Sequence, residues 1–276
     1  MNFFESIVYG IVSGLTEIFP VSSQANQMVL RQLFGTNQKE PIRDLLVHIA
    51  VLFAILLSCR GIFAKIRREQ VLAHRMRRNP SQIRTLKGVY DMRLVRTAAP
   101  VMMVGMLANL FFQGFYQNRP LFSLVLLING ALTLVPTYLH QGNRDARTMT
   151  SLDGMLIGIA AALSAIPGIS RNGAIMFMTL IREADKNNGV IWALILSVPA
   201  MVMLALLDII ALFTVGFGDI TLLAFGGYLV SMVFAFLGAY LAVSFVRMLI
   251  SRSDYSGFAY YDFGLALLSF VLYLIA

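Results

Sequence analysis

Two segments of this sequence, residues 10–23 and 158–172, look like versions of each other and hold the side chains best suited to chemistry. Each begins with Gly-Ile and runs through small or apolar residues to Leu and a hydroxyl residue. Each then reaches a proline that is followed three residues later by a serine. In an apolar chain, this repeat predicts two interrupted hydrophobic segments that build one polar site together.

The first segment carries Glu17 and the second carries Arg171. A carboxylate at membrane depth needs a partner, a proton or a water-filled cavity, and Arg171 is the natural partner if the segments meet. The prolines leave backbone N–H groups free at the start of the following segment, and such donors suit a phosphate group when an arginine and hydroxyls accompany them. The alternative is that the serines only let helices pack closely, but Glu17 and Arg171 favour a functional site. The polar residues around the pair are Ser22, Ser23, Ser170 and Asn172.

The composition is that of an integral membrane protein. Hydrophobic residues make up 58% of the 276 residues and charged residues 13%, about half the charged share of a soluble domain. The start of the chain lacks the basic region of a cleaved signal peptide, so we expect a mature N-terminus. The single Cys59 excludes an intramolecular disulfide and a cysteine-based metal site. Of the 22 Lys and Arg residues, eleven lie between Arg60 and Arg96, which indicates a cytoplasmic loop beside anionic lipid rather than a nucleic-acid partner.

Six apolar runs are long enough to cross a bilayer, which takes about 20 residues. They lie near residues 42–62, 95–115, 121–139, 188–213, 221–248 and 259–276. Two further stretches, 3–34 and 153–182, are interrupted near their middles by proline, serine and amides, and each half is too short to span. These stretches predict re-entrant helical hairpins, with two kinked full-length helices as the alternative.

The distribution of Lys and Arg sets the orientation. We expect the basic loop 63–93 to be cytoplasmic, so residues 1–38 enter from the exterior and the second interrupted stretch enters from the cytoplasm. Each half then has one hairpin and three spans, and this odd number inverts the second half. The predicted fold is an all-α membrane protein of one domain, built from inverted repeats at about 1–140 and 150–276, whose hairpin tips meet within the membrane.

The motifs resemble those of bacterial undecaprenyl-diphosphate phosphatases of the bacitracin-resistance type. Residues 14–23 (GLTEIFPVSS) are similar to the first signature of that family, and residues 167–174 (PGISRNGA) are similar to the second. Residues 196–201 (LSVPAM) and Asp208 also match the family's pattern. The resemblance covers the whole chain, and the two signatures together are specific.

The resemblance implies a hydrolase that removes the terminal phosphate of undecaprenyl diphosphate and regenerates the monophosphate carrier for peptidoglycan synthesis. It implies a plasma-membrane protein with a site open to the exterior and a divalent cation, Mg²⁺ or Ca²⁺, with a homodimer left open. Arg171 would clamp the diphosphate and offset charge in the transition state. Glu17 would hold the metal or the arginine, and Ser23 would be a nucleophile or a phosphate ligand. The implied catalytic residues are Glu17, Ser23, Ser170 and Arg171, and the implied substrate-binding residues are Ser22, Asn26, Asn172 and Gly168.

The sequence departs from the family pattern at several positions. The family's first glutamate is Ser13 here, its signature histidine is Asn26, and the serine and threonine of its second motif are Asn172 and Ile175. The tyrosine-arginine pair that opens the last helix reads Tyr-Asp, ending at Asp262. Asparagine is not an acid–base group near neutral pH, and such a group is often worth about 10²- to 10⁴-fold in rate. These departures favour the alternative of a paralogue that binds or translocates polyprenyl-phosphate lipids without hydrolysis.

His48 and Asp208 have two interpretations each. His48, on the first predicted span, could replace the missing base, but packing or a hydrogen bond is the preferred interpretation. Asp208 is interpreted as a residue of a polar cavity or a helix cap rather than an acid catalyst.

Overall fold

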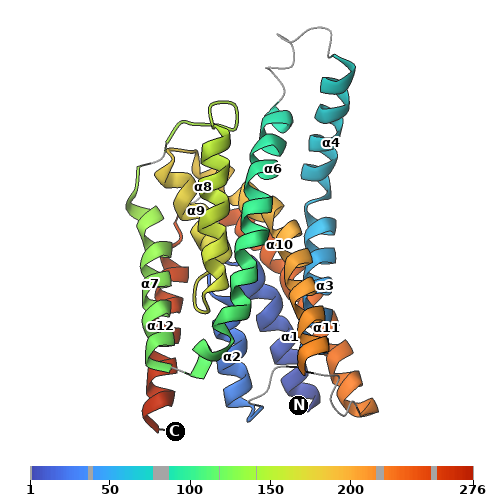
Figure 1. Cartoon of the computed structure of the whole chain (residues 1–276), viewed down its shortest axis with the longest axis vertical. Helices are drawn as coiled ribbons and strands as arrows, with labels where there is room; N and C mark the ends of the chain where they lie inside the picture. Colours follow the sequence, from blue (N-terminus) through green and yellow to red (C-terminus); the bar gives the residue numbers. More distant parts are fainter. Residues whose placement is uncertain are drawn as a thin grey trace.

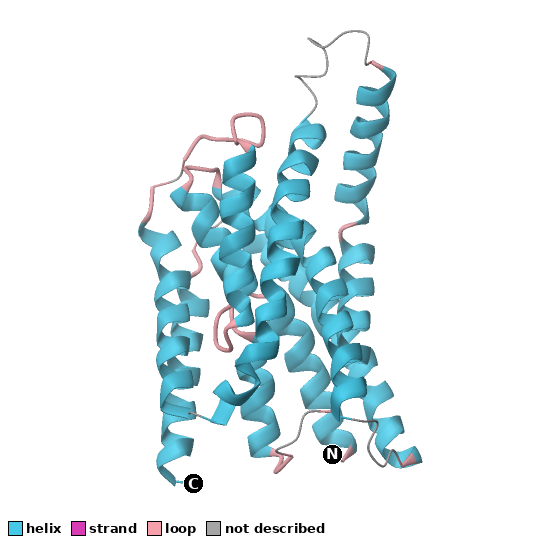
Figure 2. Ribbon diagram, in the orientation of Figure 1, coloured by secondary structure: helices cyan, strands magenta, loops and turns pink. Residues whose placement is uncertain are grey.

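The computed structural model describes residues 2–36, 40–76, 87–117, 119–140, 142–215, 221–249 and 254–275, and these residues are almost entirely helical (Figures 1 and 2). The elements in chain order are α1 (Phe3–Ile18), α2 (Ser23–Leu33), α3 (Pro41–Ser58), α4 (Arg60–Arg75), α6 (Lys87–Met106), the 3₁₀ segment η1 (Leu107–Gln117), α7 (Arg119–Tyr138), α8 (Ser151–Ala162), η2 (Leu163–Ala165), α9 (Arg171–Ile181), α10 (Lys186–Val215), α11 (Leu222–Leu249) and α12 (Ser256–Ile275). No β-strand occurs among them beyond one isolated bridge between Arg144 and Ala184.

Among the described residues, six helical segments are long and apolar enough to cross a membrane, as predicted. They are Pro41–Ser58, Gly88–Phe112, Pro120–Tyr138, Lys186–Thr214, Leu222–Met248 and Ser256–Leu274. Large apolar side chains on these segments face outward, for example Phe53, Val104, Phe213 and Leu241. Such a surface is stable in lipid and would be unstable in water.

The two interrupted stretches form pairs of short helices separated by a break. α1 ends at Ile18 and α2 begins at Ser23, while α8 with η2 ends at Ala165 and α9 begins at Arg171. The start of α1 and the end of α2 lie at the same end of the molecule, and the outer ends of α8 and α9 lie at the opposite end (Figure 1). The chain therefore doubles back at residues 19–22 and 166–170, here called the first and second tips. Re-entry of these pairs into a membrane stays a prediction.

The sequence repeat encodes matching helix caps. A capping box opens each first helix, from Asn2 to Glu5 in α1 and from Thr150 to Asp153 in α8. After each tip, a serine hydroxyl caps the next helix, because Ser22 accepts from the backbone of Ala25 and Ser170 accepts from that of Gly173. The serine that follows each proline motif thus has a local task, which is to satisfy an otherwise unpaired N–H and start a helix at the tip.

Each short pair packs on a long helix of the other half of the chain: α1 on α11, and α8 on α6. Glycines at equivalent repeat positions make the close approach possible, since a Cβ at Gly10 would overlap the Ser231 carbonyl and a Cβ at Gly158 would overlap that of Ala98. Small residues commonly allow such backbone contact between membrane helices. This reciprocal packing suits inverted repeats, although the division at about residues 140 and 150 stays a prediction.

The outer end of the second helix pair is fastened by a buried carboxylate. Asp153 is fully buried and accepts from Arg144 at 2.9 Å and from Arg182 at 2.5 Å. Burial alone would raise the pKa of Asp153, but the hydrogen bonds from Thr150 and the two guanidinium groups lower it to about 2. Asp153 therefore ties α8, the end of α9 and the preceding loop together.

The prediction of a loop over residues 63–93 is wrong for its described parts. Residues 63–75 belong to α4 and residues 87–93 to α6, while residues 77–86 lie outside the described part of the chain. The reason is an apolar stripe that the charge count concealed. Ile66 is buried, and Ile62 and Phe63 pack against the core on the same face, at helical spacing.

Candidate functional site

The two tips meet in the middle of the molecule and bring Glu17 and Arg171 together, as the repeat predicted. A terminal nitrogen of Arg171 lies 3.6 Å from the carboxylate of Glu17 and donates to the Glu17 backbone carbonyl at 3.0 Å. Both residues are buried, at 4% and 7% exposure. A guanidinium and a carboxylate that are buried next to each other offset part of the free-energy cost of burying each charge.

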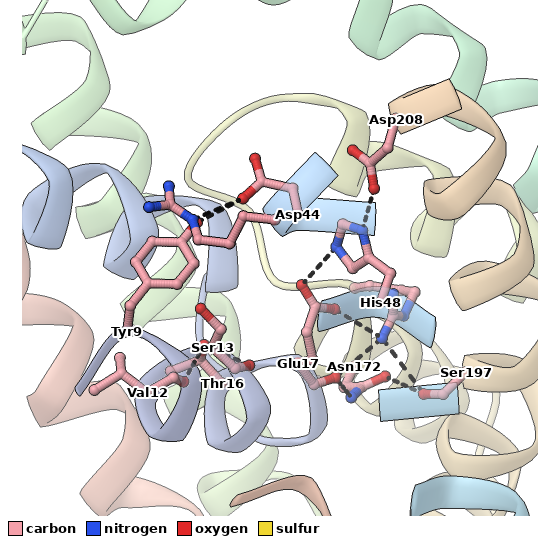
Figure 3. A network of polar contacts seen from close by, with 12 residues as sticks. Tyr9, Val12, Ser13, Thr16, Glu17, Asp44, His48, Asn172, Ser197 and Asp208 are labelled. Atoms are coloured by element: carbon pink, nitrogen blue, oxygen red, sulfur yellow. Dashed lines mark hydrogen bonds and ion pairs between the residues drawn. The ribbon is translucent and has the colours of Figure 1, made fainter. Parts of the chain in front are cut away.

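Asn172 also joins the tips (Figure 3). Its side-chain nitrogen donates to the backbone carbonyls of Glu17 at 3.1 Å and Ile18 at 2.8 Å. Its side-chain oxygen accepts from the Ser197 hydroxyl on α10 at 3.2 Å. The last carbonyls of a helix have no partner within the helix, so Asn172 and Arg171 satisfy the end of α1 from the other half of the chain.

His48 connects Glu17 to Asp208 (Figure 3). Its Nδ1 lies 2.5 Å from the Asp208 carboxylate, and its Nε2 lies 3.7 Å from the Glu17 carboxylate. The preferred interpretation of His48 as hydrogen-bonded fits this arrangement, and Asp208 does line a polar cavity. The sequence did not join these residues to Glu17, since they come from α3 and α10, far apart in the chain.

A cavity of about 590 Å³ opens from the tips toward α2 and the start of α3. Pockets that hold small molecules commonly measure about 300–1,000 Å³, so this cavity suits a diphosphate head group with part of an attached chain. Its polar lining includes Glu17, Ser23, Gln24, Gln27 and Arg31 from the first pair, Ser170, Arg171 and Asn172 from the second, and Asp44, His48 and Asp208 from the neighbouring spans.

A second polar cluster lies where the cavity approaches the start of α3. Arg31 donates to Asp44 at 2.6 Å and to the Tyr9 hydroxyl at 3.0 Å, and that hydroxyl donates to Asp44 at 2.8 Å. The Arg43 guanidinium covers the Tyr9 ring at 3.8 Å from its centroid. Sequence reasoning missed this cluster; the available signal was a pair of opposite charges, Arg31 and Asp44, at the ends of apolar segments.

Three residues predicted to bind substrate do not line the cavity. Ser22 caps α2 and is 1% exposed. Asn26 is turned toward α12, where the Tyr261 hydroxyl donates to its side-chain oxygen. Gly168 adopts a φ of +108°, which disfavours any other residue, and packs against Val125. Their positions assign them to shaping the tips, and their predicted roles in binding stay untested.

Two positions that depart from the family pattern, Ser13 and Ile175, also lie away from the cavity lining, whereas Asn172 is part of it. Ser13 is fully buried and its hydroxyl has no hydrogen-bond partner in the described part of the chain. Ile175 is fully buried in the core. Glu17, near the end of α1, is therefore the carboxylate that the first helix pair contributes to the cavity.

The side chains that could bind a divalent cation are the carboxylates and the histidine that face the cavity. Among the described residues, no three His, Cys, Asp or Glu side chains are grouped as a metal site. Asp208 is paired with His48, and Asp44 with Arg31. Calcium usually takes about 6–8 oxygen ligands, whereas Mg²⁺ is often held by one or two carboxylates together with substrate phosphates. The described residues therefore contain no preformed cation site, and Glu17 would hold a divalent cation together with the phosphates of a bound substrate.

The fold and the site define a class of protein, a multi-pass helical membrane protein. In it, the tips of two helix pairs meet beside a polar cavity that is lined by a buried arginine. The comparisons with known proteins make the identification narrower. Residues 6–268 match the family described as Bacitracin resistance protein BacA, and the chain belongs to that family.

Curated relatives cover almost the whole chain. It is 26% identical to the undecaprenyl-diphosphatase of Carboxydothermus hydrogenoformans, over 95% of this chain and 94% of the relative. It is 27% identical to the undecaprenyl-diphosphatase of Alkaliphilus metalliredigens, over 95% of both chains. It is 28% identical to undecaprenyl-diphosphatase 1 of Shouchella clausii, over 98% of this chain and 96% of the relative. The resemblance inferred from the two signatures is confirmed.

Proposed function

We propose that this protein is a phosphatase that converts undecaprenyl diphosphate to undecaprenyl monophosphate. The observation that carries the proposal is the buried Arg171, which faces a cavity shared with Glu17, Ser23 and Ser170. Membership of the BacA family and the curated names of its relatives support the same reaction. A membrane-embedded site suits a substrate whose long prenyl chain stays in lipid.

The chemistry follows from charge and position. The terminal phosphate would bind Arg171, whose fork of N–H donors matches phosphate oxygens. Two helices, α2 and α9, begin at the tips, and their N-termini add backbone donors and favourable dipoles for an anion. Such fixed donors stabilise the charge that develops as the phosphoanhydride bond breaks.

Ser23 and Glu17 face the same space and have different tasks. The Ser23 hydroxyl would either attack the terminal phosphorus, expelling undecaprenyl monophosphate and forming a phosphoserine that water then hydrolyses, or hold a phosphate oxygen while water attacks. Both roles are compatible with its place in the cavity. Glu17 is held by Arg171 on one side and by His48 on the other, while Asp208 orients His48. This chain of contacts would keep the carboxylate at a fixed position beside the substrate.

Magnesium is part of this proposal. Bound through Glu17 and the substrate, Mg²⁺ would neutralise charge on the diphosphate. Removal of divalent cations should then abolish phosphate release while leaving the protein folded, because Glu17 is also held by Arg171 and His48.

The location of the reaction is also proposed. Lys and Arg residues concentrate between Arg60 and Arg96, which favours the cytoplasmic side for that end of a plasma-membrane protein. The cavity extends toward α2 and the start of α3, the end at which the N-terminus lies (Figure 1). The site would therefore open to the exterior. Whether the protein acts as a homodimer stays a prediction.

Phosphate release from undecaprenyl diphosphate tests the proposal. The purified protein is assayed with Mg²⁺ beside Arg171→Ala, which removes the guanidinium from the cavity. Wild-type release well above that of the variant is expected, and equal release by the two proteins would overturn the proposal.

One observation favours the second function, binding or translocation of polyprenyl-phosphate lipids without hydrolysis. Asn26 stands where the family has a histidine, and it is bonded to Tyr261 instead of facing the cavity. Under this alternative, undecaprenyl monophosphate binds the wild type and binds Arg171→Ala more weakly, while neither protein releases phosphate from the diphosphate.

A further inference from the structure

One helix outside the two tips makes polar contacts with both of them. On α7, the Thr133 hydroxyl donates to the backbone carbonyl of Pro20 in the first tip at 3.2 Å. One turn earlier, the side-chain oxygen of Asn129 accepts from the backbone N–H of Ser170 in the second tip at 2.7 Å. Residues four apart lie on the same face of a helix, so a single face of α7 touches both tips. Asn129 and Thr133 are 1% and 2% exposed.

Ser170 and Asp262 together fix the direction of the Asn129 amide. The Asn129 side-chain nitrogen donates to Asp262 on α12 at 2.7 Å. The backbone N–H of Ser170 can only donate, so the amide oxygen faces Ser170 and the amide nitrogen is left for Asp262. The reverse orientation would place two buried donors together at Ser170.

α12 also reaches the first tip through a second pair of contacts. The Tyr261 hydroxyl donates to the side-chain oxygen of Asn26, whose side-chain nitrogen donates to the Ser22 carbonyl at 2.8 Å. The first tip is thus bonded to α7 through Pro20 and to α12 through Asn26. We call Asn129, Thr133, Tyr261 and Asp262 the brace.

The brace holds the tips from the side of α7 and α12, in addition to the direct bonds of Arg171 and Asn172 to the end of α1. α1 packs on α11 and α8 packs on α6, so each tip is carried by a different pair of helices, and small shifts between the pairs would change the separation of the tips. The junction has little slack: at Gly173, a Cβ would lie 3.2 Å from the Thr133 hydroxyl and 3.3 Å from the Pro20 carbonyl. Gly173 is thus the point at which the first tip, the second tip and α7 come together.

We propose that the brace sets the register of the two tips, so that Ser23 and Arg171 address the same phosphate, and that Thr133 and Asn129 are positioning residues. The inference rests on the proposed function for its reaction, but the geometry it describes would serve any phosphate ligand shared by the tips. A misplacement of about 1 Å is enough to cost about 10²-fold in rate, so a bond outside the cavity can control chemistry within it.

The test compares three substitutions on α7. Thr133→Val keeps the shape of the side chain and removes the hydroxyl, whereas Thr133→Ser keeps the hydroxyl. The matched control is Ser123→Ala, which removes a buried hydroxyl that has no hydrogen-bond partner in the described part of the chain. Phosphate release from undecaprenyl diphosphate gives kcat and KM, and the affinity for undecaprenyl monophosphate and the thermal midpoint are measured on the same preparations.

For Thr133→Val we expect kcat to fall about tenfold and KM to rise about fivefold, because one interhelical bond is lost and the two tips hold the phosphate less well. Monophosphate affinity should fall about fivefold, since the ligand lies between the same tips. Thr133→Ser should keep at least about half of both values, and Ser123→Ala should match the wild type.

The outcomes separate the inference from the proposed function. Wild-type protein that releases no phosphate refutes the proposed function, and the monophosphate affinities then decide the inference alone. Wild-type values of kcat and affinity in Thr133→Val overturn the brace. Equal losses in Thr133→Val and Thr133→Ser that track the thermal midpoint also overturn it, because they indicate packing instead of positioning.

Discussion

Replacing Asn172 by alanine should loosen the junction between the tips, and the structure indicates by how much. Asn172 donates to the carbonyls of Glu17 and Ile18 and accepts from Ser197, and all four residues are buried. Asn172→Ala removes these three bonds and leaves the Ile18 carbonyl without its partner from the other half, while the Glu17 carbonyl keeps Arg171. Interhelical hydrogen bonds in membrane proteins average about 0.6 kcal/mol, so we expect a loss of about 2 kcal/mol.

A loss of this size is measurable as a change in thermal midpoint. For a chain of this length, 1 kcal/mol corresponds to about 2–4 °C, which gives a decrease of about 4–8 °C. The chain has a single tryptophan, Trp192, which is fully buried and donates to Asp91 at 3.0 Å. Its fluorescence during heating in detergent micelles reports unfolding of the core with no added label.

Asn187→Ala is the matched control, because it removes the same amide from an exposed position at the start of α10. Its midpoint should stay within about 1 °C of the wild type. The reasoning would be refuted if Asn172→Ala also kept the wild-type midpoint. If it instead lost only affinity for undecaprenyl monophosphate, Asn172 would be a substrate ligand, as the sequence suggested, and not a clasp between the tips.

Three further substitutions test other parts of the structure. Ser23→Ala should reduce phosphate release at least about tenfold while leaving the thermal midpoint within about 2 °C, because the hydroxyl faces the cavity; full activity would exclude Ser23 from the site. The pKa of Asp153 is lowered to about 2 from 3.8, so its ionised form contributes about 2 kcal/mol above about pH 5, and this is lost as the pH falls toward 2. The stability difference between wild type and Asp153→Asn should therefore be constant from pH 7 to 5 and shrink below pH 4, and a difference independent of pH would contradict that assignment. Gly10→Val should reduce the yield of folded protein, since any Cβ there overlaps the Ser231 carbonyl of α11; wild-type yield and midpoint would show that α1 can move away.

Much of the architecture was predictable from sequence, because the bilayer limits the possible elements. A run of about 20 apolar residues in lipid forms a spanning helix, because only a helix satisfies all of its backbone hydrogen bonds within the segment. The six predicted spans agree closely with the helices. The proline and serine breaks also located the tips. The basic segment 63–93 was misjudged because its charges concealed the stripe of Ile62, Phe63 and Ile66 that makes α4 a helix.

The site was only partly predictable from sequence. The residues within the repeated segments could be paired, whereas residues elsewhere in the chain could not be connected to them. Glu17 and Arg171 could be paired because each lies beside the break of its repeated segment, and the breaks of inverted repeats are expected to meet. His48 and Asp208 have no such relation, and only the packing of α3 against α10 shows that they form a chain of contacts ending at Glu17.

The sequence by itself determined the membrane class, the helical segments, the two tips and the family to which the chain belongs. These follow from local composition, from helix-breaking residues and from motifs that can be read in order. Tertiary structure alone decided which polar residues face the cavity and which hold the tips. Ser22 and Asn26 lie within three residues of Ser23 in the sequence. Ser22 nevertheless caps α2 and Asn26 bonds to α12, while Ser23 faces the cavity. The direction of a side chain depends on its position around the helix and on the neighbour that satisfies it, and both are fixed only when the two halves of the chain pack together.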